Sequence, residues 1–333
     1  MEQNRIIGFD IIKSLAIFFV VIYHFGCVDF GKFDWGGYFP NTTKIIYELF
    51  ASSVPLFFMV NGALLQKRRI GAIKIAKYFF LSYFYPVLFY LLIFPALNLF
   101  PNKIVSIKTV LISMEFKGVY WFLFSLGLVY IVDAVAQKFR ISKVVFILLM
   151  ICPFITNLIW LSIIQINSHT ELPYWGHWGM FTLYSYVYFC LGRNLRYIEC
   201  TKRWPLLILL LFIGWALLVW EVYVYSNYNR NIYDGVNSSF PSLGAMFLSL
   251  GFFMLLKDLK IYCSSLGTYF KFIGRNTMGV YVFHIFFVYS YRYFFSTECI
   301  NPLCAILISF CIVNITAAIS ELMSKTKLRF FLK

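Results

Sequence analysis

The sequence has little charge and is especially poor in acidic side chains. Of its 333 residues, 13% are charged, and 29 Lys and Arg stand against 14 Asp and Glu. Soluble domains carry about a quarter charged residues, whereas 61% of this chain is hydrophobic and 21% is aromatic. A soluble fold of this length could not bury so much apolar surface, but the hydrocarbon core of a bilayer covers it. We therefore expect a polytopic membrane protein.

Several motifs of well-defined chemistry are also missing. The sequence has no HExxH, no complete phosphate-binding Walker loop and no GxSxG nucleophile elbow, and no carboxylate pair typical of a glycosidase is visible. The eight cysteines form no CxxC and no Cys/His spacing typical of a metal site. We therefore expect no metal and no permanently bound cofactor, and neither nucleotide hydrolysis nor serine hydrolase chemistry.

The net charge of +15 does not indicate nucleic-acid binding. The basic residues fall in short clusters between apolar runs, and they form no single basic face. A cleavable signal peptide is not evident either, because the first apolar run contains Lys13 and no A-x-A-like site follows it.

Ten segments are apolar enough and long enough to cross a membrane as helices. If the N-terminus is cytoplasmic, 21 of the 29 basic residues fall on the cytoplasmic side and 7 on the other side. The positive-inside rule then places both termini in the cytoplasm. We predict an all-α fold with transmembrane helices over residues 6–27, 44–65, 77–98, 119–137, 143–161, 178–195, 204–225, 241–257, 275–296 and 300–323.

The first predicted helix contains Lys13 and His24, and ionisable groups inside a span are often functional. Their separation of 11 residues equals three turns plus about 20°, so they share one face, about 16 Å apart along the axis. Asp10, three residues before Lys13, can pair with it. On one reading this face lines a polar cavity, where His24 takes a proton from a hydroxyl. On the other, Lys13 snorkels beside Asp10 and His24 is interfacial.

A second candidate is the basic run KRRIGAIKIAK at residues 67–77. It contains Arg68, Arg69, Lys74 and Lys77. The run either sets membrane topology or binds phosphates such as those of coenzyme A.

Four further residues lie at positions that suggest packing or chemistry. Asn61, next to Gly62, indicates a close helix approach with an interhelical hydrogen bond. Trp121 is typical of an interfacial anchor. Tyr281 and His284 are i, i+3 neighbours on one helical face, and a buried histidine is either a structural hydrogen-bonding residue or a catalytic one.

Five blocks in this order resemble the acyltransferase-3 family of bacterial inner-membrane O-acyltransferases that act on surface polysaccharides. The opening block has the family's Asp, then Lys or Arg, then ten residues, then His. The second block resembles VPLFFxxSGYLL, although Asn61 replaces the usual Ser, which argues against a serine nucleophile there. The blocks are FDIIKSLAIFFVVIYH, VPLFFMVNGALL, YWFLFSLGLVYIV, YVYFCLGRNL and IGRNTMGVYVFH.

The resemblance implies one transmembrane acyltransferase domain over residues 1–333, without an appended soluble domain, in the bacterial inner membrane. It also implies acyl-CoA, such as acetyl-CoA, as co-substrate. Lys13 and His24 occupy the catalytic positions, and His24 acts either as general base on the acceptor hydroxyl or as a transient acyl carrier. The family's basic Arg-x-x-Arg loop corresponds to Lys74 and Lys77, with Arg68 and Arg69 nearby, and Asp10, Asn61, Trp121, Tyr281 and His284 are expected to support the site.

The favoured hypothesis is therefore O-acyl transfer, with acetyl as the expected group, from acyl-CoA to a sugar hydroxyl of a lipid-linked or surface glycan such as O-antigen. The expected partners are membrane lipids, the glycan and the donor, and no oligomeric state is favoured. A transporter or flippase for a glycan or lipid intermediate would also use a polar face inside a helical bundle. A scaffold for glycan assembly is a third hypothesis, but it leaves Lys13 and His24 without a role.

Overall fold

A computed structural model describes residues 6–30, 48–65, 71–97, 120–139, 177–199, 203–229, 242–294 and 302–332. Within these ranges the secondary structure is helical and no strand occurs, which confirms the predicted all-α class. The elements are α1 (Ile7–Phe30), η1 (Glu48–Ser52), α3 (Ser53–Leu65), α4 (Ala72–Leu97), α6 (Trp121–Phe139), α8 (His177–Leu195), α9 (Trp204–Asn229), α11 (Leu243–Leu256), α12 (Ser264–Phe294), α13 (Pro302–Ser324) and α14 (Arg329–Leu332).

Within the described ranges, four helical segments are long and apolar enough to cross a membrane: Ile7–His24, Glu48–Leu65, Trp121–Lys138 and Cys304–Ser324. Two shorter apolar helical segments cover Trp204–Trp220 and Leu243–Leu256. The ten-span topology and the cytoplasmic position of both termini stay predictions. The predicted span at 143–161 lies outside the described residues.

Two helices begin earlier than the predicted spans. α4 begins at Ala72 rather than at residue 77, and α12 begins at Ser264 rather than at residue 275. Hydropathy identifies the part of a helix that lipid can cover, whereas backbone hydrogen bonding continues through polar turns such as the largely exposed residues 264–271. The sequence analysis also did not predict the short helix α14.

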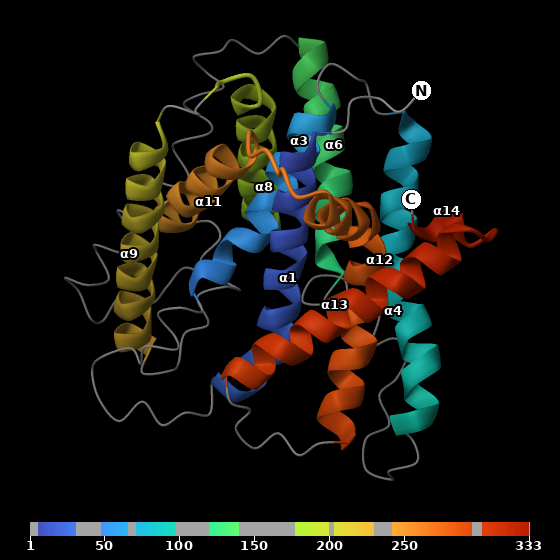
Figure 1. Cartoon of the computed structure of the whole chain (residues 1–333). Coiled ribbons are helices and arrows are strands. Elements are labelled where there is room, and N and C mark those ends of the chain that lie inside the picture. The colour runs from blue at the N-terminus through green and yellow to red at the C-terminus, as the bar shows by residue number, and fades with distance from the viewer. Residues whose placement is uncertain are drawn as a thin grey trace.

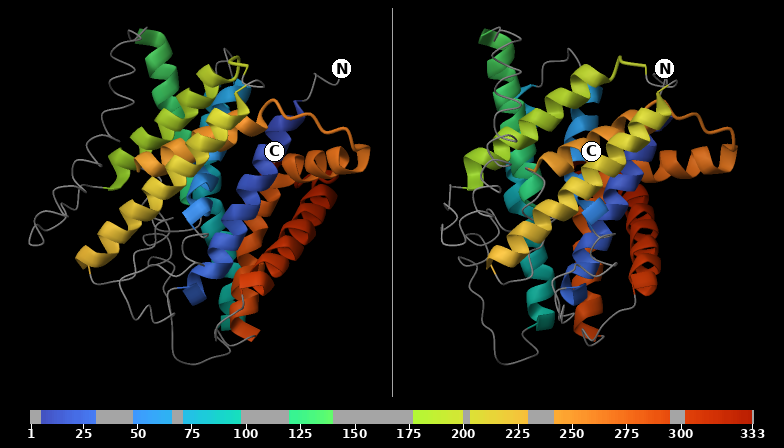
Figure 2. Two further views of the ribbon diagram at one scale, coloured as in Figure 1. Left: turned by 60° about the vertical axis from the view of Figure 1, so that its left-hand side comes forward. Right: turned by 90° about the vertical axis from the view of Figure 1, so that its left-hand side faces the viewer.

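Helix α1 lies inside the assembly and contacts α12, α3 and α13. Its side chains Ile12, Ala16 and Ile17 are fully buried. α3 packs mainly on α8, and α11 packs mainly on α9, which forms one edge of the molecule in Figure 1. The turned views in Figure 2 show α13 beside α12 and α1. The first helix is therefore held by segments from both halves of the chain.

Helices α3 and α8 approach each other through two glycines. A Cβ atom at Gly62 would overlap the main-chain carbonyl of Phe189, and one at Gly192 would overlap the carbonyl of Met59. Next to this contact, the Tyr130 hydroxyl of α6 donates to Asn61 Oδ1 over 3.3 Å. The predicted close approach and interhelical hydrogen bond at Asn61 are confirmed.

A bidentate ion pair joins α6 to α8. The Arg193 guanidinium donates to both oxygens of Asp133, over 2.5 and 2.7 Å, and Gln137 donates to the same carboxylate over 2.8 Å. Asp133 is buried and Arg193 is largely so. Two parallel bonds fix the relative position of the helices more tightly than a single point contact would.

Candidate active site

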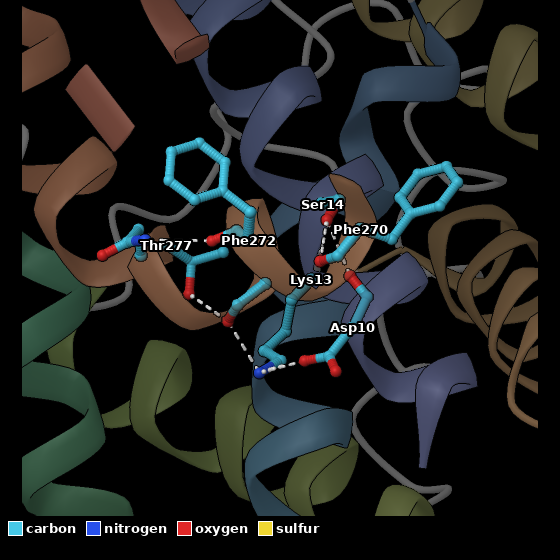
Figure 3. A network of polar contacts seen from close by, with 8 residues as sticks. Asp10, Lys13, Ser14, Phe270, Phe272 and Thr277 are labelled. Atoms are coloured by element: carbon cyan, nitrogen blue, oxygen red, sulfur yellow. Dashed lines mark hydrogen bonds and ion pairs between the residues drawn. The ribbon is translucent and has the colours of Figure 1, made fainter. Parts of the chain in front are cut away.

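The Lys13 ammonium lies between α1 and α12 (Figure 3). Its Nζ atom is 3.0 Å from Asp10 Oδ1 and donates to the Gly274 carbonyl oxygen over 2.7 Å. The Lys13 side chain is 19% exposed and that of Asp10 is 3% exposed. The predicted pair with Asp10 is confirmed, and the pair neutralises a charge that would be costly if it were buried alone.

The face shared by Lys13 and His24 lies against α12. Lys13 bonds to the main chain at Gly274, and the centroid of the His24 ring is 5.2 Å from that of His284. The predicted common face is confirmed. Helix α12 covers this face both at Lys13 and at His24. The sequence did not indicate this, because Gly274 and His284 are more than 250 residues away from them along the chain.

A pocket of about 700 Å³ opens between α1, α3, α4, α6, α12 and α14. Its wall is largely apolar, but four basic side chains come from three helices. They are Lys13 of α1, Lys74 and Lys77 of α4, and Arg275 of α12. The other lining residues are Phe57, Val60, Asn61, Leu64, Gly71, Ile73, Tyr78, Phe122, Leu123, Leu126, Thr277, Met278, Tyr281, Phe331 and Leu332.

The pocket therefore brings together five of the predicted site residues: Lys13, Asn61, Lys74, Lys77 and Tyr281. Lys74 Nζ lies 6.0 Å from the centroid of the Tyr130 ring, and desolvation lowers the pKa of its ammonium from the ordinary value.

Two other predicted residues fall outside the part of the chain that the structure describes, and a third does not line the pocket. Arg68 and Arg69 are outside the described residues. Trp121 is half-buried at the first position of α6 and does not line the pocket, although its neighbour Phe122 does.

Arg275 was not predicted as a site residue, because a basic residue at the end of an apolar run was interpreted as a signal of membrane topology. The Arg275 side chain lines the pocket and its Nη2 atom also lies 2.9 Å from Glu321 Oε2 of α13. The signal that could have found it is its place within the IGRNTMGVYVFH block, which also carries Tyr281 and His284.

Helix α14 forms another part of the pocket wall, which was not predicted from the sequence. Lys77 donates to the main-chain carbonyl of Phe330, and its Nζ lies 4.4 Å from the centroid of the Phe330 ring. Tyr85 donates to the Phe331 carbonyl, and the Phe331 ring stacks on Phe84 with centroids 5.0 Å apart. These contacts hold α14 against α4, so that Phe331 and Leu332 line the pocket.

The histidine pair adjoins one residue of the pocket wall. Tyr281 lines the pocket, and its ring centroid is 6.0 Å from that of His284. The nine residues from Arg275 to His284 span about 13 Å of helix. One helix, α12, therefore connects the basic wall to the histidine pair.

A comparison with known protein families identifies the domain to which this chain corresponds. The acyltransferase domain of the acyltransferase-3 family matches residues 6–321, nearly the whole chain. The chain belongs to this family. Searches of curated proteins and of solved structures find no match. Family membership supports an acyltransferase, and together with the apolar helices it indicates a membrane protein. It favours acyl transfer over the transporter and scaffold hypotheses.

The geometry offers this acyltransferase two chemical environments. The pocket combines basic groups with apolar walls, which suits a ligand that carries both phosphates and an apolar arm. Beside the pocket, His24 provides an imidazole, the side chain that most often serves as a general base. Among the described residues, no group of three or more His, Cys, Asp or Glu side chains is placed to hold a metal ion.

Proposed function

We propose that the protein is an O-acyltransferase of the bacterial inner membrane that moves an acetyl group from cytoplasmic acetyl-CoA to a sugar hydroxyl. The acceptor would be a lipid-linked or surface polysaccharide such as O-antigen. One observation carries the proposal: a pocket has four basic side chains in its wall, and its lining residue Tyr281 adjoins His284, whose ring lies beside that of His24.

The donor would enter with its phosphates toward Lys74, Lys77 and Arg275. Charge-assisted hydrogen bonds to phosphate are strong, and the arginine fork adds a bidentate contact that lysine cannot make. The volume of about 700 Å³ lies within the range of small-molecule sites. Its apolar lining, including Phe57 and Leu126, suits the pantetheine arm.

Lys13 would orient the thioester or pantetheine portion of the donor. Its ammonium lines the pocket while Asp10 and the Gly274 carbonyl hold it in place. Because Lys13 and His24 are about 16 Å apart along α1, the Lys13 ammonium would hold the donor's arm rather than touch the reacting carbon.

His24 would act as general base on the acceptor hydroxyl. The hydroxyl oxygen attacks the thioester carbon, a C–O bond forms and the C–S bond breaks. The hydroxyl proton passes to His24 and then to the departing thiolate of coenzyme A, so that the acylated sugar and free coenzyme A are the products.

The test uses purified full-length protein in liposomes, given radiolabelled acetyl-CoA and a candidate acceptor glycan, with the acetylated product identified by mass spectrometry. We expect His24→Ala and Lys13→Ala each to abolish product. Lys327→Ala, which removes an exposed lysine away from the pocket, is the control and should keep full activity. Full acetylation by inserted His24→Ala protein would overturn the catalytic assignment, and translocation of the glycan without acyl transfer would favour the transporter.

A further inference from the structure

His284 is fully buried in α12, and the contacts of one ring nitrogen fix its tautomer. Its Nδ1 atom lies 2.8 Å from the Tyr281 carbonyl oxygen and 3.1 Å from the Val280 carbonyl oxygen. A carbonyl oxygen can only accept, so Nδ1 carries the proton. Because the side chain is 0% exposed, the neutral ring is favoured over a buried cation. Nε2 is then an unprotonated acceptor.

The Nε2 atom is the unusual part of this residue. It is buried, and among the described residues no hydrogen-bond partner is recorded for it. Buried acceptors in native proteins normally have a donor, because leaving them unpaired forfeits their bond with water. The back-bond satisfies Nδ1 and leaves Nε2 available to a donor.

The ring that faces His284 across the helix interface is His24. Their centroids are 5.2 Å apart and the ring planes make an angle of 43°. Two tyrosine rings adjoin the pair: Tyr23 lies 5.2 Å from His24, and Tyr281 lies 6.0 Å from His284. Tyr23, Tyr281 and His284 are buried and His24 is half-buried, so a hydrogen bond between the two imidazoles would be stronger there than in water.

We propose that His284 is the positioning residue for His24, with its Nε2 accepting the N–H of the His24 imidazole. This inference rests on the proposed function, in which His24 is the base. The bond to His284 would hold one His24 nitrogen as the donor, so that the other stays unprotonated and faces the acceptor hydroxyl. This is the arrangement in which a base is oriented by a third group.

The same bond would act during the transfer step. When His24 takes the hydroxyl proton, it becomes an imidazolium whose two nitrogens both donate. His284 Nε2 then accepts a charge-assisted bond, which stabilises the cation. The proton that His24 gained leaves with coenzyme A as the thiol, so His284 itself neither gains nor loses a proton overall.

Two substitutions of His284 can separate a structural role of this residue from a positioning role. Asn61, Asn194, Asn276 and Asn314 each donate from Nδ2 to the carbonyl four residues earlier, over 2.8 to 3.0 Å. His284→Asn should therefore keep the back-bond to α12 but place no acceptor at the Nε2 position. His284→Gln reaches that position with its amide oxygen but is a poorer match for the back-bond.

The kinetic test compares the two variants with the wild type in liposomes, using acetyl-CoA and an acceptor glycan. We expect His284→Asn to keep the thermal midpoint and the KM for acetyl-CoA while kcat falls tenfold or more, and His284→Gln to recover part of kcat. Wild-type kcat in His284→Asn would overturn the proposal.

A second measurement does not depend on activity. The chain has four histidines, so ¹⁵N-histidine spectra of the wild type, His284→Asn and His24→Ala assign the pair. We expect a protonated Nδ1 and a hydrogen-bonded, unprotonated Nε2 at His284, with the Nε2 shift altered by His24→Ala. An Nε2 signal unmoved by that change would overturn the proposal. If the wild type transfers no acyl group but the signal moves, the proposed function fails while the pairing stands.

Discussion

The ammonium of Lys77 and the ring of Phe330 are in direct contact, with Nζ 4.4 Å from the ring centroid, although the two residues are 253 positions apart. The same ammonium lines the pocket. The C-terminal helix therefore engages a cation that the proposed function assigns to the donor's phosphates, so that α14 and the donor would compete for it.

Removing this competitor should strengthen donor binding. Phe330→Ala deletes a cation–π contact of about 0.5–1 kcal/mol, so we expect the Kd for acetyl-CoA to fall about two- to fivefold with little change in kcat. Equilibrium binding of radiolabelled acetyl-CoA measures this. Leu328→Ala, an exposed apolar residue outside the pocket, is the control. Weaker binding by Phe330→Ala would show that α14 helps to hold the donor.

The Lys13–Asp10 pair allows stability to be separated from chemistry. Asp10→Asn leaves the Lys13 charge without its carboxylate, and breaking a buried pair costs on the order of 3 kcal/mol. The double change Asp10→Asn with Lys13→Met removes both charges, so we expect it to restore much of the thermal midpoint without restoring activity. Thermal unfolding in detergent and acetyl transfer in liposomes are the two measurements. Active double-variant protein would mean that Lys13 serves packing alone.

The basic side chains of the pocket should bind the donor in a salt-dependent manner. We expect Lys74→Gln, Lys77→Gln and Arg275→Gln each to raise the Kd for acetyl-CoA about tenfold, since a hydrogen bond to a charged group contributes about 1.5–3 kcal/mol. The difference should shrink at high salt, because exposed charges are screened. The exposed Lys327 again supplies the control. Equal affinities at low salt would place the phosphates elsewhere.

Binding of dephospho-acetyl-CoA, which lacks the 3′-phosphate, sharpens that experiment. A basic residue that contacts the 3′-phosphate should lose its effect with this ligand, while a residue that contacts the pyrophosphate should keep it. The comparison thus assigns Lys74, Lys77 and Arg275 to particular phosphates.

The close contact between α3 and α8 should tolerate no side chain at Gly62 or Gly192. A Cβ at either position overlaps a carbonyl of the facing helix, so the helices must separate and we expect a loss of about 1–3 kcal/mol or more. Gly267→Ala is the matched control, since nothing lies within 4 Å of a Cβ there and alanine favours a helix interior. Unchanged thermal midpoints for Gly62→Ala would contradict the contact.

Sequence reasoning recovered local relationships well. The common face of Lys13 and His24 and the pair between Lys13 and Asp10 follow from the helical repeat, since residues 3 or 11 apart are neighbours on a helix whatever surrounds it. The hydrogen bond beside Gly62 was also predictable, because a small residue next to an amide within apolar sequence favours close packing.

The residues that meet in the site from different helices were harder to predict from the sequence. Arg275 and Arg329 of α14 were interpreted as topology signals, because a charge at the end of an apolar run gives the same pattern whether it faces water or a pocket. His284 was recognised as a candidate, but nothing local indicates which helix covers it.

The sequence by itself determined the all-helical class, the membrane character and the family, because apolar runs, charge content and ordered motifs are properties of the chain read in one dimension. Tertiary structure alone decided that α12 covers the first helix, that four basic groups share one pocket, and that His24 faces His284. Those pairings depend on which helix surfaces fit together, through contacts such as Gly62 on Phe189. Such complementarity arises between segments far apart in sequence and has no local pattern.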